Sequence, residues 1–117
     1  MARKAMNLKW KKGRQKSGYE KLKVFESKFL KFDCYLLKFK KGSFIDKHTD
    51  PVHGHKHYRF NLNLNTGYVG GDPVVYGKCI FKNRFFYLFR PDIVLHEVSK
   101  IKKGVRYTLS IGWLVKA

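Results

Sequence analysis

A chain of 117 residues with 44% hydrophobic and 16% aromatic content is long enough for one packed domain, and its composition excludes global disorder. No apolar run reaches the roughly 18 residues that a transmembrane helix needs, so no membrane partner is predicted. The first residues lack the apolar stretch of a secretory signal, and we therefore expect a cytoplasmic protein.

The charge of the chain is strongly unbalanced, with 26 basic against 8 acidic residues and a formal net charge of +18. Such an excess favours a polyanionic partner, meaning DNA, RNA or an acidic protein surface. The alternative is that the charge serves solubility alone. Cys34 and Cys79 do not suggest a disulfide framework in a chain without an export signal, and we expect both to be buried as small apolar residues.

The N-terminal residues 1–17 contain many bases and no acid, and their hydrophobic periodicity is poor. We interpret them as a basic arm that precedes a single domain over residues 18–117. The basic residues of this arm are Arg3, Lys4, Lys9, Lys11, Lys12, Arg14 and Lys16.

From Gly18 onward the pattern is one of short β-rich runs separated by turn signals. Tyr19–Phe25 alternates imperfectly, as a strand would. Helical periodicity is confined, at best, to Glu20–Lys31, so we predict at most one short helix near the N-terminus. Lys82-Asn83-Arg84 is expected to form the turn of a hairpin, and Gly70-Gly71 a turn that needs positive φ. The predicted class is all-β, a sandwich or barrel. Its strands are expected over Phe32–Lys40, Tyr58–Asn65, Val74–Phe81, Phe85–Phe89, Ile93–Val98 and Val105–Val115.

The segment His48-Thr49-Asp50 is the first candidate for chemistry. In extended backbone, residues i and i+2 point to the same face, so an imidazole and a carboxylate converge there. With His96 from another β-like segment, they form the two-histidine, one-carboxylate set of non-haem iron(II) oxygenases. The alternative is a surface turn in which Asp50 caps a backbone amide.

Arg106 and Thr108 share a face of the last predicted strand, ten residues beyond His96. A guanidinium fork beside a hydroxyl suits a carboxylate at the end of a small pocket. The alternative is an ordinary surface arginine on a basic protein.

Taken together, the ordered motifs resemble the iron(II)- and 2-oxoglutarate-dependent oxygenases, and the prolyl-hydroxylase-like branch is the most similar. The resemblance extends from about Leu36 to Trp113. Its motifs are Gly42-x5-His48-x-Asp50, Tyr58-Arg59-Phe60-Asn61-Leu62-Asn63-Leu64-Asn65, Gly70-Gly71-Asp72, Phe89-Arg90-Pro91-Asp92-x3-His96-Glu97-Val98 and Gly104-Val105-Arg106-Tyr107-Thr108.

This resemblance implies a double-stranded β-helix, or jelly roll, around an iron(II) ion held by His48, Asp50 and His96. Arg106, with help from Thr108, would pair with the far carboxylate of the co-substrate 2-oxoglutarate. The implied enzyme is a dioxygenase that hydroxylates a macromolecule, either a nucleic acid or a protein residue, with succinate and carbon dioxide as co-products.

The strand after the first histidine departs from the family pattern, because it lacks the tyrosine that often reaches the co-substrate. Asn61 and Asn63 are expected on its polar face as further co-substrate ligands, whereas the apolar face with Phe60 and Leu62 is expected to pack in the core. The alternative is a plain amphipathic strand whose polar face lies in water. A neighbouring set is expected to contact substrate at the mouth of the barrel, namely His53, His55, His57 and Arg59.

Two rival functions stay open on the sequence alone. One is a non-catalytic, basic nucleic-acid-binding module on the same fold, although all four key residues are present. The other is a cupin-like metalloprotein of different chemistry, which would not need Arg106 at its position.

Overall fold

The computed structural model describes residues 9–13 and 17–117, and within them every regular element is a β-strand. The strands are β1 (Trp10–Lys12), β2 (Glu20–Ser27), β3 (Phe32–Phe39), β4 (Ile45–His48), β5 (His55–Asn63), β6 (Val69–Gly70), β7 (Pro73–Tyr76), β8 (Phe81–Lys82), β9 (Phe86–Phe89), β10 (Leu95–Val98), β11 (Ile101–Lys103) and β12 (Arg106–Lys116). The described part of the chain contains no helix that could cross a membrane.

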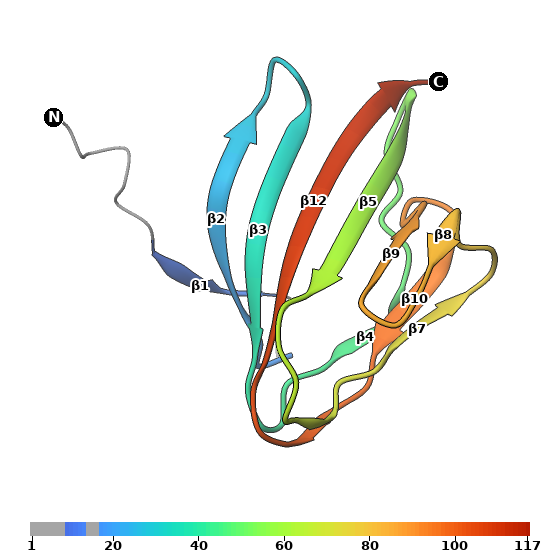
Figure 1. Ribbon diagram of the computed structural model, residues 1–117. Helices are drawn as coiled ribbons and strands as arrows, with labels where there is room; N and C mark the ends of the chain where they lie inside the picture. The colour runs from blue at the N-terminus through green and yellow to red at the C-terminus, as the bar shows by residue number, and fades with distance from the viewer. Residues whose placement is uncertain (1–8, 14–16) are drawn as a thin grey trace, which may run out of the picture.

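The strands form a seven-stranded sheet in the order β1-β2-β3-β12-β5-β9-β8, a three-stranded sheet β4-β10-β7 and a two-stranded ribbon β11-β6. All pairings are antiparallel. The large sheet curves along one side of the molecule, and the small sheet lies across from it (Figure 1). This arrangement is a jelly roll, as predicted.

The segment from Glu20 to Lys31 is the main error of the predicted secondary structure. It forms strand β2 and a tight turn instead of a helix, and Lys31 takes a left-handed φ of 54° in that turn. Pairing of β2 with β3 over most of its length outweighs the weak helical preference of the isolated segment. A bulge between Lys23 and Phe25 explains why the alternation of this strand is imperfect in the sequence.

The region from Val74 to Phe81 is two strands where one was expected. Strand β7 belongs to the small sheet, whereas β8 belongs to the large one. The expected hairpin does exist between β8 and β9, and Asn83 closes its turn by accepting hydrogen bonds from the amides of Phe85 and Phe86.

The expected N-terminal arm overlaps the sheet. Residues Trp10–Lys12 pair with β2, and Ser17 is buried, with its carbonyl accepting a hydrogen bond from the amide of Phe44. The rest of the arm, residues 1–8 and 14–16, lies outside the described residues.

The hydrophobic core is small and lies at the closed end of the fold. It consists of Tyr19, Phe39, Val98 and Ile101, with Tyr19 and Phe39 stacked at 5.0 Å between ring centroids. Gly71 borders it with a φ of 66°, and a Cβ there would lie 2.2 Å from the Cδ1 atom of Ile101. Two features of Gly71 therefore favour glycine at this predicted turn, namely its positive φ and its close approach to Ile101.

The side chains of the large sheet are distributed differently from our expectation. The polar residues of β5 do face the interior, but Phe60 and Leu62 are half-exposed on the outside of the sheet instead of packed in the core. The interior at this level is a polar pocket, which leaves the apolar face directed outward. The two cysteines are free, as expected, but they are half-buried and not buried.

Candidate metal centre and pocket

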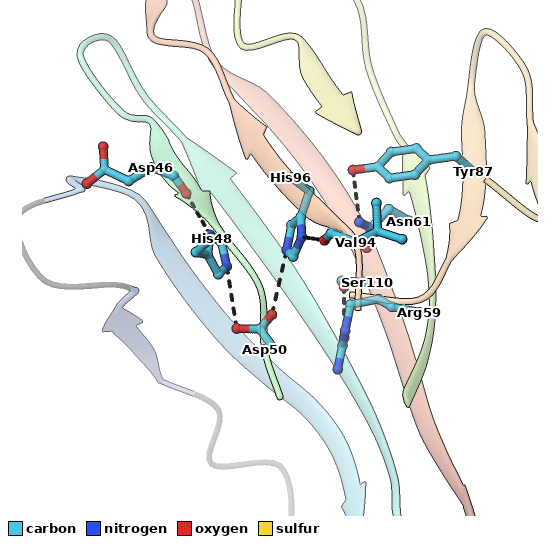
Figure 2. A network of polar contacts seen from close by, with 9 residues as sticks. All are labelled: Asp46, His48, Asp50, Arg59, Asn61, Tyr87, Val94, His96 and Ser110. Atoms are coloured by element: carbon cyan, nitrogen blue, oxygen red, sulfur yellow. Dashed lines mark hydrogen bonds and ion pairs between the residues drawn. The ribbon is translucent and has the colours of Figure 1, made fainter. Parts of the chain in front are cut away.

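The three predicted metal ligands come together in the small sheet. His48 ends β4, and the register pairs it directly with His96 on the neighbouring β10. Asp50 follows His48 by two residues, and its backbone amide donates a hydrogen bond to the carbonyl of Pro91. Two residues beyond His48, the Asp50 carboxylate points to both imidazoles, as Figure 2 shows.

The ligand atoms of the three side chains converge. The Asp50 carboxylate oxygens lie 3.4 Å from Nε2 of His48 and 3.6 Å from Nε2 of His96. One ligand atom from each residue falls within 4.8 Å of the other two. Two imidazole nitrogens and a carboxylate oxygen in this arrangement match the donor set of a first-row divalent metal with open coordination positions.

The remaining ring nitrogens are held by backbone carbonyls. Nδ1 of His48 lies 2.6 Å from the carbonyl oxygen of Asp46, and Nδ1 of His96 lies 2.9 Å from that of Val94 (Figure 2). A carbonyl can only accept, so each Nδ1 carries the proton and each Nε2 presents its lone pair to the centre. Phe89 further orients His96 through an edge contact at 4.9 Å.

A pocket of about 280 Å³ extends from this centre between the sheets. Asp50 of the triad lies on its wall, and Glu97 also borders it, although the Glu97 carboxylate accepts a hydrogen bond from the exposed Tyr76. Cationic side chains reach the pocket from the large sheet, which suits an anionic ligand. These cations are Lys21, Arg59 and Arg106.

Arg106 and Thr108 line this pocket and are both only 3% exposed. Nη1 of Arg106 donates to the Gly71 carbonyl at 2.8 Å, and the guanidinium lies over the Phe39 ring at 5.6 Å. Nε of Arg106 and Oγ1 of Thr108 have no hydrogen-bond partner within the described residues. Buried polar atoms are normally satisfied, so this pair marks the place where a polar ligand fits.

The two asparagines predicted as co-substrate ligands are separated by the structure. Asn61 lines the pocket and donates from Nδ2 to the Tyr87 hydroxyl at 3.0 Å, which leaves its buried Oδ1 without a partner in the described structure. Asn63 donates to the Tyr68 hydroxyl at 2.7 Å and is not among the residues that line the pocket. Two residues further along, the strand has moved beyond the pocket towards the closed end.

The histidine-rich segment is also divided. His57 lines the pocket, whereas His53 is exposed and Nδ1 of His55 lies 2.9 Å from the His53 carbonyl, both away from the pocket. Partial burial, and then the nearby positive charge of Arg59, lower the pKa of His57 below its ordinary value. Only His57 of this group is therefore placed to meet a ligand in the pocket.

Arg59 reaches across the interior of the large sheet. Its Nη2 donates to both carboxylate oxygens of Asp33 at 2.9 and 3.0 Å, and its Nη1 donates to the Ser110 hydroxyl at 2.9 Å. The guanidinium expected at the barrel mouth is thus committed to a partner on β3 and forms part of the pocket wall.

Tyr87 is the functional candidate that the sequence did not reveal. It is 9% exposed, lines the pocket beside Asn61 and stands on β9, the neighbour of β5. Burial is the main reason why its pKa is raised, so its hydroxyl keeps its proton. In the run Phe86-Tyr87-Leu88-Phe89, Tyr87 points to the opposite side of the strand from Phe86 and Leu88. This alternation is the signal in the sequence that could have indicated Tyr87.

No protein-family model and no curated protein sequence matches this chain. Solved structures do match it. A prolyl-4-hydroxylase from Pseudomonas putida has a TM-score of 0.68 and 16% identity over 92% of this chain and 77% of that one. KdgF from a Halomonas species has a TM-score of 0.62 and 9% identity, over 90% and 84% of the two chains. A cupin-2 domain from Rhodospirillum rubrum has a TM-score of 0.61 and 13% identity, over 95% and 71%. At these identities the likeness shows the fold, a cupin-like jelly roll, and it leaves the reaction to the residues of the site.

Proposed function

We propose that this protein is an iron(II)- and 2-oxoglutarate-dependent dioxygenase. The observation that carries the proposal is the presence of two matched features in one pocket. At one place the nitrogen and oxygen ligands of His48, Asp50 and His96 converge, and at the other the buried Arg106 and Thr108 present unpaired polar atoms.

The residues fit the proposed metal. Both Nε2 lone pairs and a carboxylate point to one place, and backbone carbonyls fix the tautomer of each histidine. Three protein ligands leave coordination positions for exogenous ligands, as oxygenase chemistry requires. When bound, the iron would supply oxygen activation, which no side chain of the protein can provide.

The residues at the other end fit a dicarboxylate. A carboxylate that enters between Arg106 and Thr108 would accept hydrogen bonds from Nε and from the hydroxyl, both of which lack partners. The hydroxyl of Tyr87, held by Asn61, lies on the same wall and can donate a hydrogen bond to a carboxylate oxygen. Tyr87 is therefore a candidate for the role of the tyrosine that the family often carries on the strand after the first histidine.

The balanced reaction converts 2-oxoglutarate, dioxygen and a substrate C–H group to succinate, carbon dioxide and the hydroxylated substrate. The substrate that we propose is a macromolecule with negative charge, either a nucleic acid or an acidic protein segment. The net charge of +18 supports this choice because it attracts polyanions over distances beyond direct contact. A non-catalytic nucleic-acid-binding module on the same fold is the alternative, and it gives no reason for the triad and Arg106 to share a pocket.

The test is the formation of succinate from 2-oxoglutarate by purified protein with iron(II), screened over DNA, RNA and basic or acidic peptides. His48→Ala, Asp50→Ala and His96→Ala are expected to abolish both iron binding and succinate formation. His55→Ala is the matched control, because this histidine lies near the site in sequence but outside the pocket. Iron binding that all three triad variants retain would refute the metal assignment, and iron binding without 2-oxoglutarate binding would favour another cupin chemistry.

A further inference from the structure

The central strand of the large sheet, β12, turns its polar side chains to the interior and its apolar side chains to the outside. An ordinary core strand does the opposite. On β12, Arg106, Thr108 and Ser110 are each 3% exposed in the interior, whereas the alternating Leu109 and Ile111 are partly exposed on the outside. Strand β5 repeats this arrangement, so these two neighbouring strands carry polar residues inward and apolar residues outward.

The registers align these outward side chains into continuous rows across the sheet. One row is Phe25–Cys34–Ile111–Phe60–Leu88–Phe81, and the next is Trp10–Leu22–Leu36–Leu109–Leu62–Phe86. A shorter row, Phe32–Trp113–Tyr58, lies beside the first. We call these three rows the outer face.

The three rows themselves contain no charged residue, although the chain as a whole is 29% charged. Two cations lie over rings at the margin of the outer face, Lys38 over Trp10 and Arg90 over Tyr58. None of its side chains is buried by the described part of the chain. Its aromatic rings pack on one another, with Phe60 and Phe86 at 5.3 Å and Phe81 and Phe86 at 5.2 Å between centroids. A contiguous uncharged patch of this kind marks an interaction surface.

The size of the outer face is sufficient for a specific interface. Strands spaced about 4.8 Å apart and outward residues spaced about 6.8 Å along each strand give a projected area on the order of 500 Å². Two such faces together would bury about 1,000 Å², which is the area that a biological interface is expected to reach.

We propose that the outer face binds the outer face of a second copy, so that the protein is a symmetric dimer with sheet packed on sheet. The net charge of the chain indicates which partner binds the outer face. Two chains of net charge +18 repel each other, and the outer face is a surface on which they can meet with lysines and arginines confined to its margin. An acidic partner would instead be drawn to the charged surfaces elsewhere on the molecule.

The proposed geometry keeps the catalytic pockets independent. Face-to-face sheets pack about 10 Å apart with interdigitating side chains, and Ile111 and Leu109 lie on β12, flanked by strands on both sides. A two-fold axis there makes the contact isologous, so that each copy buries the same residues. The pocket opens on the opposite side of the sheet, so dimerisation goes beyond the proposed function and does not depend on it.

The test is the mass of the full chain by light scattering and sedimentation over a range of concentrations and at moderate salt. The expected mass is twice that of one chain. Ile111→Lys is expected to give a monomer, whereas Ile93→Lys should stay dimeric, because Ile93 is 64% exposed and lies away from the outer face. A wild-type monomer at every concentration, or a dimer that survives Ile111→Lys, would overturn the proposal.

The cysteines provide a second readout that needs no substitution. Cys34 lies within the outer face beside Ile111, whereas Cys79 lies outside it. Both thiols are half-buried and free, and partial burial raises the pKa of each. Alkylation of Cys34 by a bulky maleimide should slow as protein concentration rises, while the rate at Cys79 stays constant. Equal behaviour of the two thiols would count against the dimer even if Ile111→Lys failed to fold.

Discussion

The guanidinium of Arg59 occupies the space above Gly112 that the Cβ of any other residue would fill. A methyl group on Gly112 would lie 2.1 Å from Nη2 of Arg59. Because Gly112 stands on β12, between Arg59 on β5 and Asp33 on β3, the missing side chain lets the arginine cross one strand to reach its carboxylate partner on the next.

Gly112→Ala should therefore break the contact between Arg59 and Asp33 and lower the free energy of unfolding by about 1–3 kcal/mol, the usual cost of overpacking. Thermal or urea denaturation measures this change. In an Arg59→Met background the same substitution should cost much less, because the flexible side chain can move aside. If Gly112→Ala lowered the free energy of unfolding equally in both backgrounds, the alanine would act through a neighbour other than Arg59.

Arg106→Met should weaken the binding of 2-oxoglutarate by about 2–5 kcal/mol, because a charge-assisted contact to a buried carboxylate is lost. Titration calorimetry with a divalent metal present measures it, and metal affinity should change little. Arg84→Met is the matched control, because Arg84 lies exposed in the turn between β8 and β9. Unaltered 2-oxoglutarate affinity in Arg106→Met would mean that the dicarboxylate binds elsewhere.

His57 should make the protein less stable in mild acid. Its pKa is lowered in the folded state, chiefly by burial, so the unfolded chain binds the proton more readily. Its contribution to stability is fully present above the unfolded value of about 6.5 and is lost as the pH falls through that value towards the lower folded pKa. Between these two pH values, the free energy of unfolding measured by denaturation should depend more steeply on pH for the wild type than for His57→Gln. Identical slopes would exclude His57 as the group responsible.

Binding to nucleic acid should depend strongly on salt. Each phosphate contact releases counterions, so the logarithm of affinity should fall linearly with the logarithm of salt, with a slope of about −0.7 to −0.9 per contact. Deletion of residues 1–8, which removes Arg3 and Lys4 but leaves β1 in place, should flatten this slope without changing 2-oxoglutarate affinity. Fluorescence anisotropy across a salt series measures the nucleic-acid affinity of the full chain and of the shortened one. Weak, salt-insensitive binding of DNA and RNA would point to an acidic protein as substrate.

The convergence of His48 and Asp50 could be predicted from their spacing. That of His96 followed from the family resemblance, because nothing local places its strand beside His48. The sequence also predicted the polar and apolar faces of β5 and the shared face of Arg106 and Thr108 on β12, since alternation separates the two faces of a strand. Alternation does not say which face is interior, and the usual rule that apolar residues point inward gave the wrong answer for Phe60 and Leu62.

Contacts between strands that are distant in sequence could not be predicted. Arg59 meets Asp33 only because β12 lies between β5 and β3 in this register, and a shift of one residue would remove the contact. The same holds for Tyr87, whose approach to Asn61 depends on the pairing of β9 with β5. The separation of Asn61 from Asn63 reflects where the pocket ends, which is a property of the packed sheets.

The central position of β12 also bears on how the protein is made. Strands β3 and β5 are both synthesised before β12, yet in the large sheet they pair with it and not with each other. The sheet therefore stays open until the last strand leaves the ribosome, and its long-range pairings make closure slow. During that interval the apolar side chains of β3 and β5 lie unjoined on the nascent chain, and exposed apolar strands of this kind favour aggregation.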